Sequence, residues 1–411
     1  MGARLSFGLR GLQSTLAFRI TPRALGATFL AAVVGLLCVP AAGASPAIKI
    51  GLLDDHQTLF LPGTAFPQYD ELNIQVLRIN LRWDQVAPTA PTGTPSDPGP
   101  GSYDQAKWLP YDNAIKAAAA ITPAPTQVFL SILGSPSWAN GGHDFRWAPT
   151  NLQLQAFAKA AATRYSGTYD DPNNPGTPLP RVRYWGAWNE PNLHTFLRPQ
   201  WKRIGGRWVS TAPIQYARIC NQVYNGVHGA QTADALEKVA CGLTSPRGNN
   251  IPGSANPSHT PLLFLRGMKR GGAKFDAYGH QPYSLKNSPT WKPDGNHMIS
   301  LGNISVLVQE LTRLYGPKRL WITEYGYESN PPDPQLGVSQ STQAKWLKQA
   351  FGIAKAHTRI DMFIWFLLID EQDRNGPASG APGWQSGLMR FGWTMGQPRK
   401  PAWTTFMNLT P

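Results

Sequence analysis

Residues 182–192 read VRYWGAWNEPN, a short apolar run that ends abruptly in asparagine, glutamate and proline. A second stretch, LWITEYG at residues 320–326, is also short and apolar, and its apolar run is likewise interrupted by a glutamate, Glu324. Runs this short and this apolar are typical of parallel strands that are covered on both faces. Each glutamate is therefore expected at the carboxyl end of a buried strand.

Further runs of this kind bring the expected strands to eight, at 48–53, 75–81, 127–133, 182–188, 238–242, 275–279, 320–323 and 362–368. Helical patterns lie between them, most clearly at 111–120, 152–165, 214–229, 300–315 and 341–357. This alternation predicts an α/β chain folded as a single (β/α)8 TIM barrel. An open doubly wound sheet would usually show a Gly-rich phosphate turn, which the sequence lacks.

The connections that leave strands are long, whereas most of those that return from helix to strand are short. The long ones are 84–110, 138–150, 191–211, 245–261, 281–298, 325–340 and 369–401. Barrel enzymes build their sites from the loops at the carboxyl ends of the strands. The loop lengths therefore agree with a barrel whose site lies at that end.

The N-terminus has the features of a secretory signal peptide. Four arginines without any acid precede an apolar stretch at 24–38, and a small-residue site follows, Ala42-Gly43-Ala44. We expect a signal peptide at 1–44, a secreted catalytic chain at 45–411 and no stable membrane association after cleavage. The alternative is an uncleaved membrane anchor, since no charge lies between Arg23 and Lys49.

Charge and cysteine content narrow the function classes. The formal net charge is +14, and loss of the four leader arginines leaves +10, which favours either colloidal solubility or binding to acidic polymers. The basic residues are scattered and no nucleic-acid module accompanies them, so no nucleic-acid partner is expected. Cys220 and Cys241 are either a disulfide or two buried thiols. No metal motif occurs, so we expect no metal or cofactor, and a monomer.

Glu190 and Glu324 are the candidate catalytic residues. They follow the fourth and seventh strands, which lie across a barrel from each other, so both carboxyl groups are expected in one central cleft. Glycoside cleavage needs such a pair, one protonated and one ionised. The alternative is that both glutamates form buried ion pairs with arginines.

Trp188-Asn189-Glu190-Pro191 and Thr323-Glu324-Tyr325-Gly326 resemble the paired signatures of the clan A glycoside hydrolases. The resemblance covers about residues 48–408 and implies a retaining hydrolase that acts on oligo- or polysaccharides. It implies that Glu190 is the acid/base, that Asn189 binds the sugar 2-hydroxyl and that Glu324 is the nucleophile.

Other positions resemble the same pattern. Arg78 resembles the arginine beneath the nucleophile, with a pair to Asp54 or Asp55 as the alternative. Trp365 resembles the tryptophan floor of the subsite before the scissile bond, with ordinary core as the alternative. His280 and Tyr283 resemble a substrate-binding His–Tyr pair, although their spacing is one residue wider than the usual His-x-Tyr.

Trp138 is the best placed of several tryptophans expected in the mouth loops, where aromatic faces stack on sugars. Asp370, Glu371 and Asp373 are expected either in a solvated loop or as ligands of sugar hydroxyls or calcium. Two other functions remain open on the sequence: a carbohydrate-binding barrel without activity, and a transglycosylase that acts on cell-surface glycan.

Overall fold

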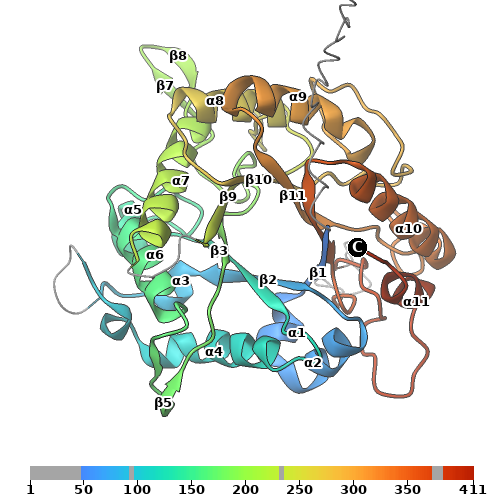
Figure 1. Cartoon of the computed structure of the whole chain (residues 1–411). Helices are drawn as coiled ribbons and strands as arrows, with labels where there is room; N and C mark the ends of the chain where they lie inside the picture. Colours follow the sequence, from blue (N-terminus) through green and yellow to red (C-terminus); the bar gives the residue numbers. More distant parts are fainter. Residues whose placement is uncertain (1–47, 92–96, 231–235, 373–382) are drawn as a thin grey trace, which may run out of the picture. The chain divides into compact units, whose positions relative to one another are not determined.

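The computed structural model describes residues 48–91, 97–230, 236–372 and 383–411, so the predicted leader lies outside the described residues. Eight parallel strands close into a barrel, as the sequence predicted (Figure 1). In barrel order they are β1 (Lys49–Leu53), β2 (Val76–Arg82), β3 (Gln127–Leu133), β6 (Tyr184–Ala187), β9 (Lys238–Thr244), β10 (Ala277–His280), β11 (Arg319–Tyr325) and β12 (Ile360–Phe366).

Helices surround this barrel in Figure 1. The long ones are α2 (Pro62–Glu71), α4 (Gln105–Ala119), α6 (Gln153–Arg164), α7 (Ala212–His228), α8 (Pro261–Arg270), α9 (Ile304–Tyr315) and α10 (Gln340–Ala356). Shorter ones are α1 (Asp55–Phe60), α3 (Trp83–Val86), α5 (Ser137–Asn140) and α11 (Pro401–Met407), with 3-10 turns at Pro100–Ser102 and Leu301–Asn303. No helix in the described part of the chain is both long enough and apolar enough to cross a membrane.

The helix starts differ from the expected ones by one to six residues. Helix α4 begins at Gln105 rather than 111, because Asp104 caps it through a 2.9 Å bond from the Ala106 amide and the helix continues through Pro110. Helix α10 begins at Gln340 rather than 341, because Ser339 caps it through a bond from the Thr342 amide. The positions at which these helices begin were therefore predicted wrongly by a few residues, whereas the presence of each helix was predicted correctly.

The barrel lumen is filled by large aromatic rings set against glycines. Phe129 and Tyr184 each contact the Trp321 ring edge-on, with ring centroids 5.4 Å apart. A Cβ on Gly186 would lie 2.9 Å from the Phe129 ring, so only glycine fits there. This packing closes the barrel below the site and leaves polar groups to the carboxyl ends of the strands.

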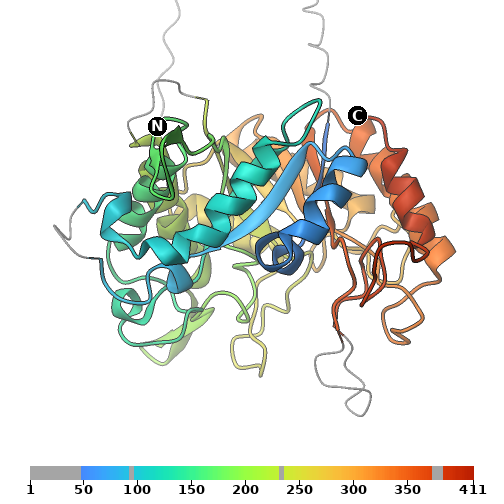
Figure 2. The same cartoon turned by 90° about the horizontal axis from the view of Figure 1, so that it is seen from below.

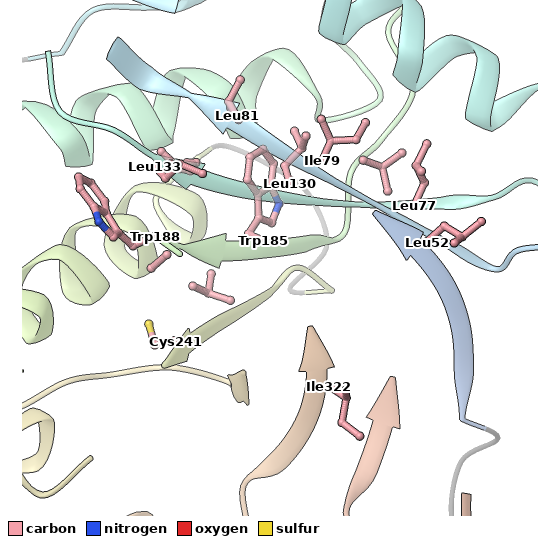
Figure 3. Packing of buried hydrophobic residues seen from close by; sticks show 14 of the residues in the cluster. Leu52, Leu77, Ile79, Leu81, Leu130, Leu133, Trp185, Trp188, Cys241 and Ile322 are labelled. Atoms are coloured by element: carbon pink, nitrogen blue, oxygen red, sulfur yellow. The ribbon is translucent and has the colours of Figure 1, made fainter. Parts of the chain in front are cut away.

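The outward faces of the strands form the larger core with the helices. Leu77, Leu130 and Trp185 belong to this buried layer (Figure 3). A disulfide joins Cys220 of α7 to Cys241 of β9 and so fixes that helix to the barrel. Of the two alternatives open from the sequence, the structure has the disulfide.

Two hairpins decorate the loops, and the side view in Figure 2 shows how the loops extend from the barrel ends. The first, β4 (Asp170–Asp171) with β5 (Asn174–Pro178), lies in a helix-to-strand connection. The second, β7 (Trp201–Ile204) with β8 (Arg207–Ser210), lies in the connection from β6 to α7, which starts at Trp188 and contains Glu190.

Candidate active site

Glu190 is positioned by a strained turn at the end of β6. Trp188 and Glu190 both have left-handed backbone, with φ of 70° and 36°. Such a conformation costs a non-glycine residue on the order of 1–3 kcal/mol and persists only where the surroundings hold it. Here the Trp188 amide donates to Ile132 O (2.7 Å), and the Glu190 amide donates to Leu243 O (2.9 Å). The neighbouring strands therefore determine where Glu190 points.

Glu324 lies near the end of β11 and is 8% exposed. Its Oε1 accepts hydrogen bonds from Arg78 Nη1 (2.8 Å) and Gln281 Nε2 (2.9 Å). Its Oε2 accepts from the Tyr283 hydroxyl (3.0 Å). Three donors from β2 and the loop after β10 thus hold the carboxylate and stabilise its charged form.

Arg78 hydrogen-bonds to residues of both glutamate motifs. Its side chain is fully buried and also donates to Thr323 O (2.9 Å) and to Asn189 Oδ1 (2.8 Å). One guanidinium therefore links the β6 and β11 motifs. The alternative pairing does not occur: Asp55 accepts from Asn80 (2.8 Å), and Asp54 from the amides of Gln57, Leu368 and Ile369.

The orientation of the Asn189 amide follows from its donors. Its Oδ1 accepts from Arg78, which has no acceptor, and from Gln281 Nε2 (2.7 Å), which also donates to Glu324. The Asn189 nitrogen must therefore point away from both. It is left to donate a hydrogen bond to another group in the cleft.

The two glutamates have different electrostatic surroundings. Burial and then the charge of Glu324 raise the pKa of Glu190 to about 8, against lowering by Ser245, Arg78 and Arg247. Burial also raises the pKa of Glu324, but the charge of Arg78 and the hydrogen bonds of Tyr283 and Arg78 oppose it. Glu324 loses its proton first, and its charge then keeps Glu190 protonated at neutral pH.

Comparison with known proteins identifies the fold. The chain matches a family 39 glycoside hydrolase from Bacteroides cellulosilyticus WH2 with a TM-score of 0.56 at 18% identity, over 88% of this chain and 63% of that one. It matches a β-glucosidase from Pyrococcus furiosus (TM-score 0.55, 11% identity, 88% and 94% covered) and a fungal β-1,4-galactanase (0.52, 13%, 88% and 100%). The chain has the fold of these glycoside hydrolases. No family model and no curated protein sequence matches it.

Within this glycoside hydrolase fold, His280 does not line the cleft as predicted. It is fully buried, with Nε2 3.0 Å from Ile299 O and Nδ1 2.8 Å from Thr244 Oγ1. A carbonyl only accepts, so Nε2 carries the proton and the Thr244 hydroxyl donates to Nδ1. Burial lowers the His280 pKa to about 4, so the ring is a neutral clamp between β9 and the loop before α9.

Gln281 takes the predicted place of His280. It contacts both Glu324 and Asn189, and Gln281-Pro282-Tyr283 has the two-residue spacing that His280 and Tyr283 lack. The wider spacing between His280 and Tyr283 was therefore the feature of the sequence that could have indicated Gln281 instead. Tyr283 does reach Glu324, as described above.

Trp365 also differs from its prediction by one position. Its indole is fully buried in the layer between strands and helices, and Nε1 donates to Ser386 O (2.9 Å). Met362 and Ile364 belong to the lumen cluster, and Phe366 packs against it. Phe366, not Trp365, therefore presents a ring at the barrel mouth, where the exposed Trp384 lies edge-on to it at 6.1 Å.

Trp138 is half-buried in α5. Its indole nitrogen donates to Ala87 O (2.8 Å), and its ring lies edge-on to Trp83 at 5.7 Å. These contacts fix the β3 and β2 loops to each other, and one part of the ring remains exposed. A sugar contact by Trp138 stays a prediction.

The sequence also missed two residues that support Glu190. Asn192 is fully buried, and its amide donates to Arg247 O (3.1 Å) and His259 O (3.0 Å), while its Oδ1 accepts from the Ser245 amide (2.9 Å). The Ser245 side chain in turn hydrogen-bonds to Glu190. No cluster of three or more His, Cys, Asp or Glu among the described residues has a geometry that would hold a metal ion.

Proposed function

We propose that the chain is a secreted retaining glycoside hydrolase that cleaves O-glycosidic bonds of oligo- or polysaccharides by double displacement. One observation carries the proposal: two carboxyl groups at the ends of different barrel strands interact, with the charge of Glu324 raising the pKa of Glu190 while Arg78 and Tyr283 stabilise the ionised form of Glu324. Glycoside cleavage requires that combination. The likeness of the fold to glycoside hydrolases supports the same conclusion.

In the first step, Glu324 attacks the anomeric carbon while Glu190 gives its proton to the glycosidic oxygen, and the bond to the leaving sugar breaks. An ester then joins the remaining sugar to Glu324. In the second step, Glu190, now ionised, takes a proton from water, and the water oxygen displaces Glu324. Arg78 and Tyr283 bind the carboxylate before and after each displacement. The free amide hydrogens of Asn189 are suited to a sugar hydroxyl beside the reacting carbon.

The test is a panel of aryl glycosides assayed with wild type, Glu190→Ala and Glu324→Ala. We expect Glu324→Ala to lose activity on every substrate. Glu190→Ala should still react with good leaving groups, stall at the ester and recover turnover with azide as a glycosyl azide of retained configuration, because azide needs no general base. Wild type should release sugar of retained configuration, which NMR of the product detects.

Three results would contradict the proposal. Inverted product from the wild type would exclude double displacement. Exchange of the two mutants' behaviour would reverse the two roles. Polysaccharide binding without turnover of any glycoside in the panel would favour a carbohydrate-binding barrel. Export is checked separately by N-terminal sequencing of protein from the medium, which we expect to begin at Ser45.

A further inference from the structure

The two loops on the Glu190 side of the mouth have an unusual charge. Residues 191–211 follow Glu190 in the connection from β6 to α7, and residues 245–260 join β9 to α8. Together they contain no Asp or Glu and carry five basic residues, Arg198, Lys202, Arg203, Arg207 and Arg247. Among the described residues, the one ion pair of these loops is between Arg198 and Asp144 from the loop after β3 (3.8 Å), and Asp144 binds Arg146 more closely, at 2.7 Å. This side of the mouth is therefore positive.

The β7–β8 hairpin concentrates that charge beside exposed apolar groups. It stands out from the ring of helices near α7 and α8 (Figure 1). Gly205 and Gly206, at φ of 56° and 77°, form the tight turn that joins its strands. Ile204 is 60% exposed and Trp208 is 46% exposed, and the Arg203 guanidinium lies 5.5 Å from the Trp208 ring centre.

Four of the cations are available to a ligand. Lys202, Arg203, Arg207 and Arg247 are exposed, and none forms an ion pair with a carboxylate of the described residues. An exposed tryptophan among unpaired cations is suited to a sugar ring that carries an anionic group, since the indole covers the C–H face and the cations bind the anion.

The hairpin is rigidly connected to the acid/base. Trp201 stacks on His259 with ring centroids 4.4 Å apart and planes 11° apart. His259 Nδ1 lies 2.7 Å from Gln200 Oε1 and its Nε2 lies 2.7 Å from Ser210 Oγ, so both ends of the hairpin meet one buried ring. The His259 carbonyl accepts from Asn192, which also binds the Ser245 amide beside Glu190. A ligand on the hairpin is thus held at a fixed distance from Glu190.

The Arg247 backbone is held near Glu190, since its carbonyl accepts from Asn192 (3.1 Å), whose oxygen binds the Ser245 amide (2.9 Å). The charge of Arg247, like that of Arg78, lowers the pKa of Glu190. Glu190 protonates the leaving oxygen in the proposed reaction, so the leaving sugar lies on the Glu190 side of the cleft. Arg247 is therefore next to that sugar, and the hairpin is next to sugars farther along the chain.

We propose that the loops after β6 and β9 form leaving-group subsites for an anionic polysaccharide, with Arg247 beside the first leaving sugar and Lys202, Arg203, Arg207 and Trp208 farther out. The inference rests on the proposed hydrolase function and specifies its substrate class. The anionic group is either a uronic acid carboxylate or a sulfate, and both are recognised by the same cations.

The experiment measures binding separately from turnover. The purified Glu324→Gln protein is titrated at 50 mM and 300 mM NaCl with two matched pairs: glucuronoxylan and its carboxyl-reduced form, and a sulfated galactan and its desulfated form. We expect one acidic member to bind about tenfold more tightly than its neutral partner at low salt, with most of the difference lost at high salt. The pair that shows the difference identifies the anionic group.

Charge variants locate the surface. In the Glu324→Gln protein, K202Q/R203Q/R207Q should weaken binding of the acidic polymer about tenfold and R247Q about threefold, whereas K107Q/K345Q/K348Q, which removes three exposed cations from α4 and α10, should change it less than twofold. Thermal unfolding of each variant checks that it is folded. Trp208→Ala should weaken binding of acidic and neutral polymers alike, because it removes the ring and no charge.

Several results would overturn the inference. Equal binding of acidic and neutral members in both pairs would do so, as would an equal effect of the control triple. Equally tight binding of poly-glutamate, or binding of phosphatidylglycerol vesicles without polysaccharide binding, would mean that the hairpin is a general cationic surface or a membrane contact. Turnover of aryl glycosides by wild type is measured in a separate assay. Loss of turnover there would contradict the hydrolase proposal, whereas the binding results above test the inference about the anionic substrate.

Discussion

Two buried ion pairs lie near the carboxyl ends of the barrel strands, and only one belongs to the candidate active site. In the Arg78–Glu324 pair the side chains are 0% and 10% exposed, and in the Lys400–Asp370 pair they are 0% and 2% exposed. Lys400 Nζ donates to Asp370 (2.7 Å), Ser329 Oγ (2.9 Å) and Gln385 O (3.1 Å), which uses all three of its hydrogens. The Gly387 amide also donates to Asp370 (2.8 Å), so this pair is held on both sides, whereas the charge of Glu324 acts on the catalytic candidate Glu190.

The comparison teaches that a buried ion pair does not by itself mark a reactive site. Burial raises the pKa of Asp370 to about 6 although Lys400 opposes it, so its electrostatics are perturbed as those of an active site are. Glu324 differs in being less enclosed, 8% exposed against 3% for Asp370, and in its stronger effect on a second carboxyl group: its charge is a leading cause of the raised pKa of Glu190, whereas Asp370 is a minor cause of the raised pKa of Glu328. Access and a partner group separate the two pairs, and each can be removed by mutation.

The largest contrast is expected between the carboxylates. Glu324→Gln should lower kcat/KM on an aryl glycoside about 10⁴-fold or more, because the nucleophile is lost. Asp370→Asn should leave kcat/KM of the folded protein within about twofold and lower the free energy of unfolding by about 3 kcal/mol, because Lys400 loses its charged partner. Steady-state kinetics and urea unfolding measure both. Similar activity losses in the two variants would erase the distinction.

Arg78→Met should affect both properties. It leaves Glu324 without its cation and Asn189 without a donor, so we expect kcat/KM to fall about 10²–10³-fold and stability to fall by about 3–5 kcal/mol. The pKa of Glu324 should rise, which moves the acidic limb of the kcat/KM profile to higher pH, since activity needs the ionised form. An unmoved acidic limb would show that Arg78 does not set that pKa. Arg78→Lys, which keeps the charge, is the control.

Lys400→Met should affect stability alone. A buried Asp370 without its partner is expected to cost about 3–5 kcal/mol. The sign of its pH dependence follows from Asp370: without Lys400 its pKa rises further above 6, so the cost should be smaller at pH 5, where Asp370 is protonated, than at pH 8. Urea unfolding at both pH values measures this. A shifted pH–activity profile in folded Lys400→Met would mean that this pair communicates with the cleft.

The smallest expected effect concerns the proton on Glu190. Since Glu190 must be protonated and its pKa is about 8, kcat/KM of wild type should fall as pH rises through about 8. The hydrogen bond from Ser245 lowers that pKa, so Ser245→Ala should move the basic limb upward by less than about one pH unit and leave the acidic limb in place. Movement of the acidic limb instead would assign the limbs to the opposite glutamates.

Much of the fold followed from local patterns. The eight strands and the alternation with helices were readable because a buried parallel strand needs a short apolar run and a crossover helix needs a period near 3.6. Glu190 and Glu324 were readable because a carboxyl group at the end of such a run is costly without a function. The position of Phe366 could also have been predicted. Side chains alternate along a strand, so Phe366 lies on the same face as Met362 and Ile364, and Trp365 lies on the opposite face.

Only the tertiary structure decided the contacts between segments distant in the sequence. The register of β11 against β12 shifts between Ile322 and Tyr325, so strict alternation from Trp321 would not have turned Glu324 toward Arg78. His280 is a clamp and Gln281 a site residue because Thr244 and the Ile299 carbonyl, both far along the chain, complete the ring's hydrogen bonds. Asp370, expected in a solvated loop or as a ligand, is instead enclosed by Lys400. Sequence patterns report which groups prefer burial, but the partners that satisfy a buried polar group come from other strands and loops, and these meet only in the folded chain.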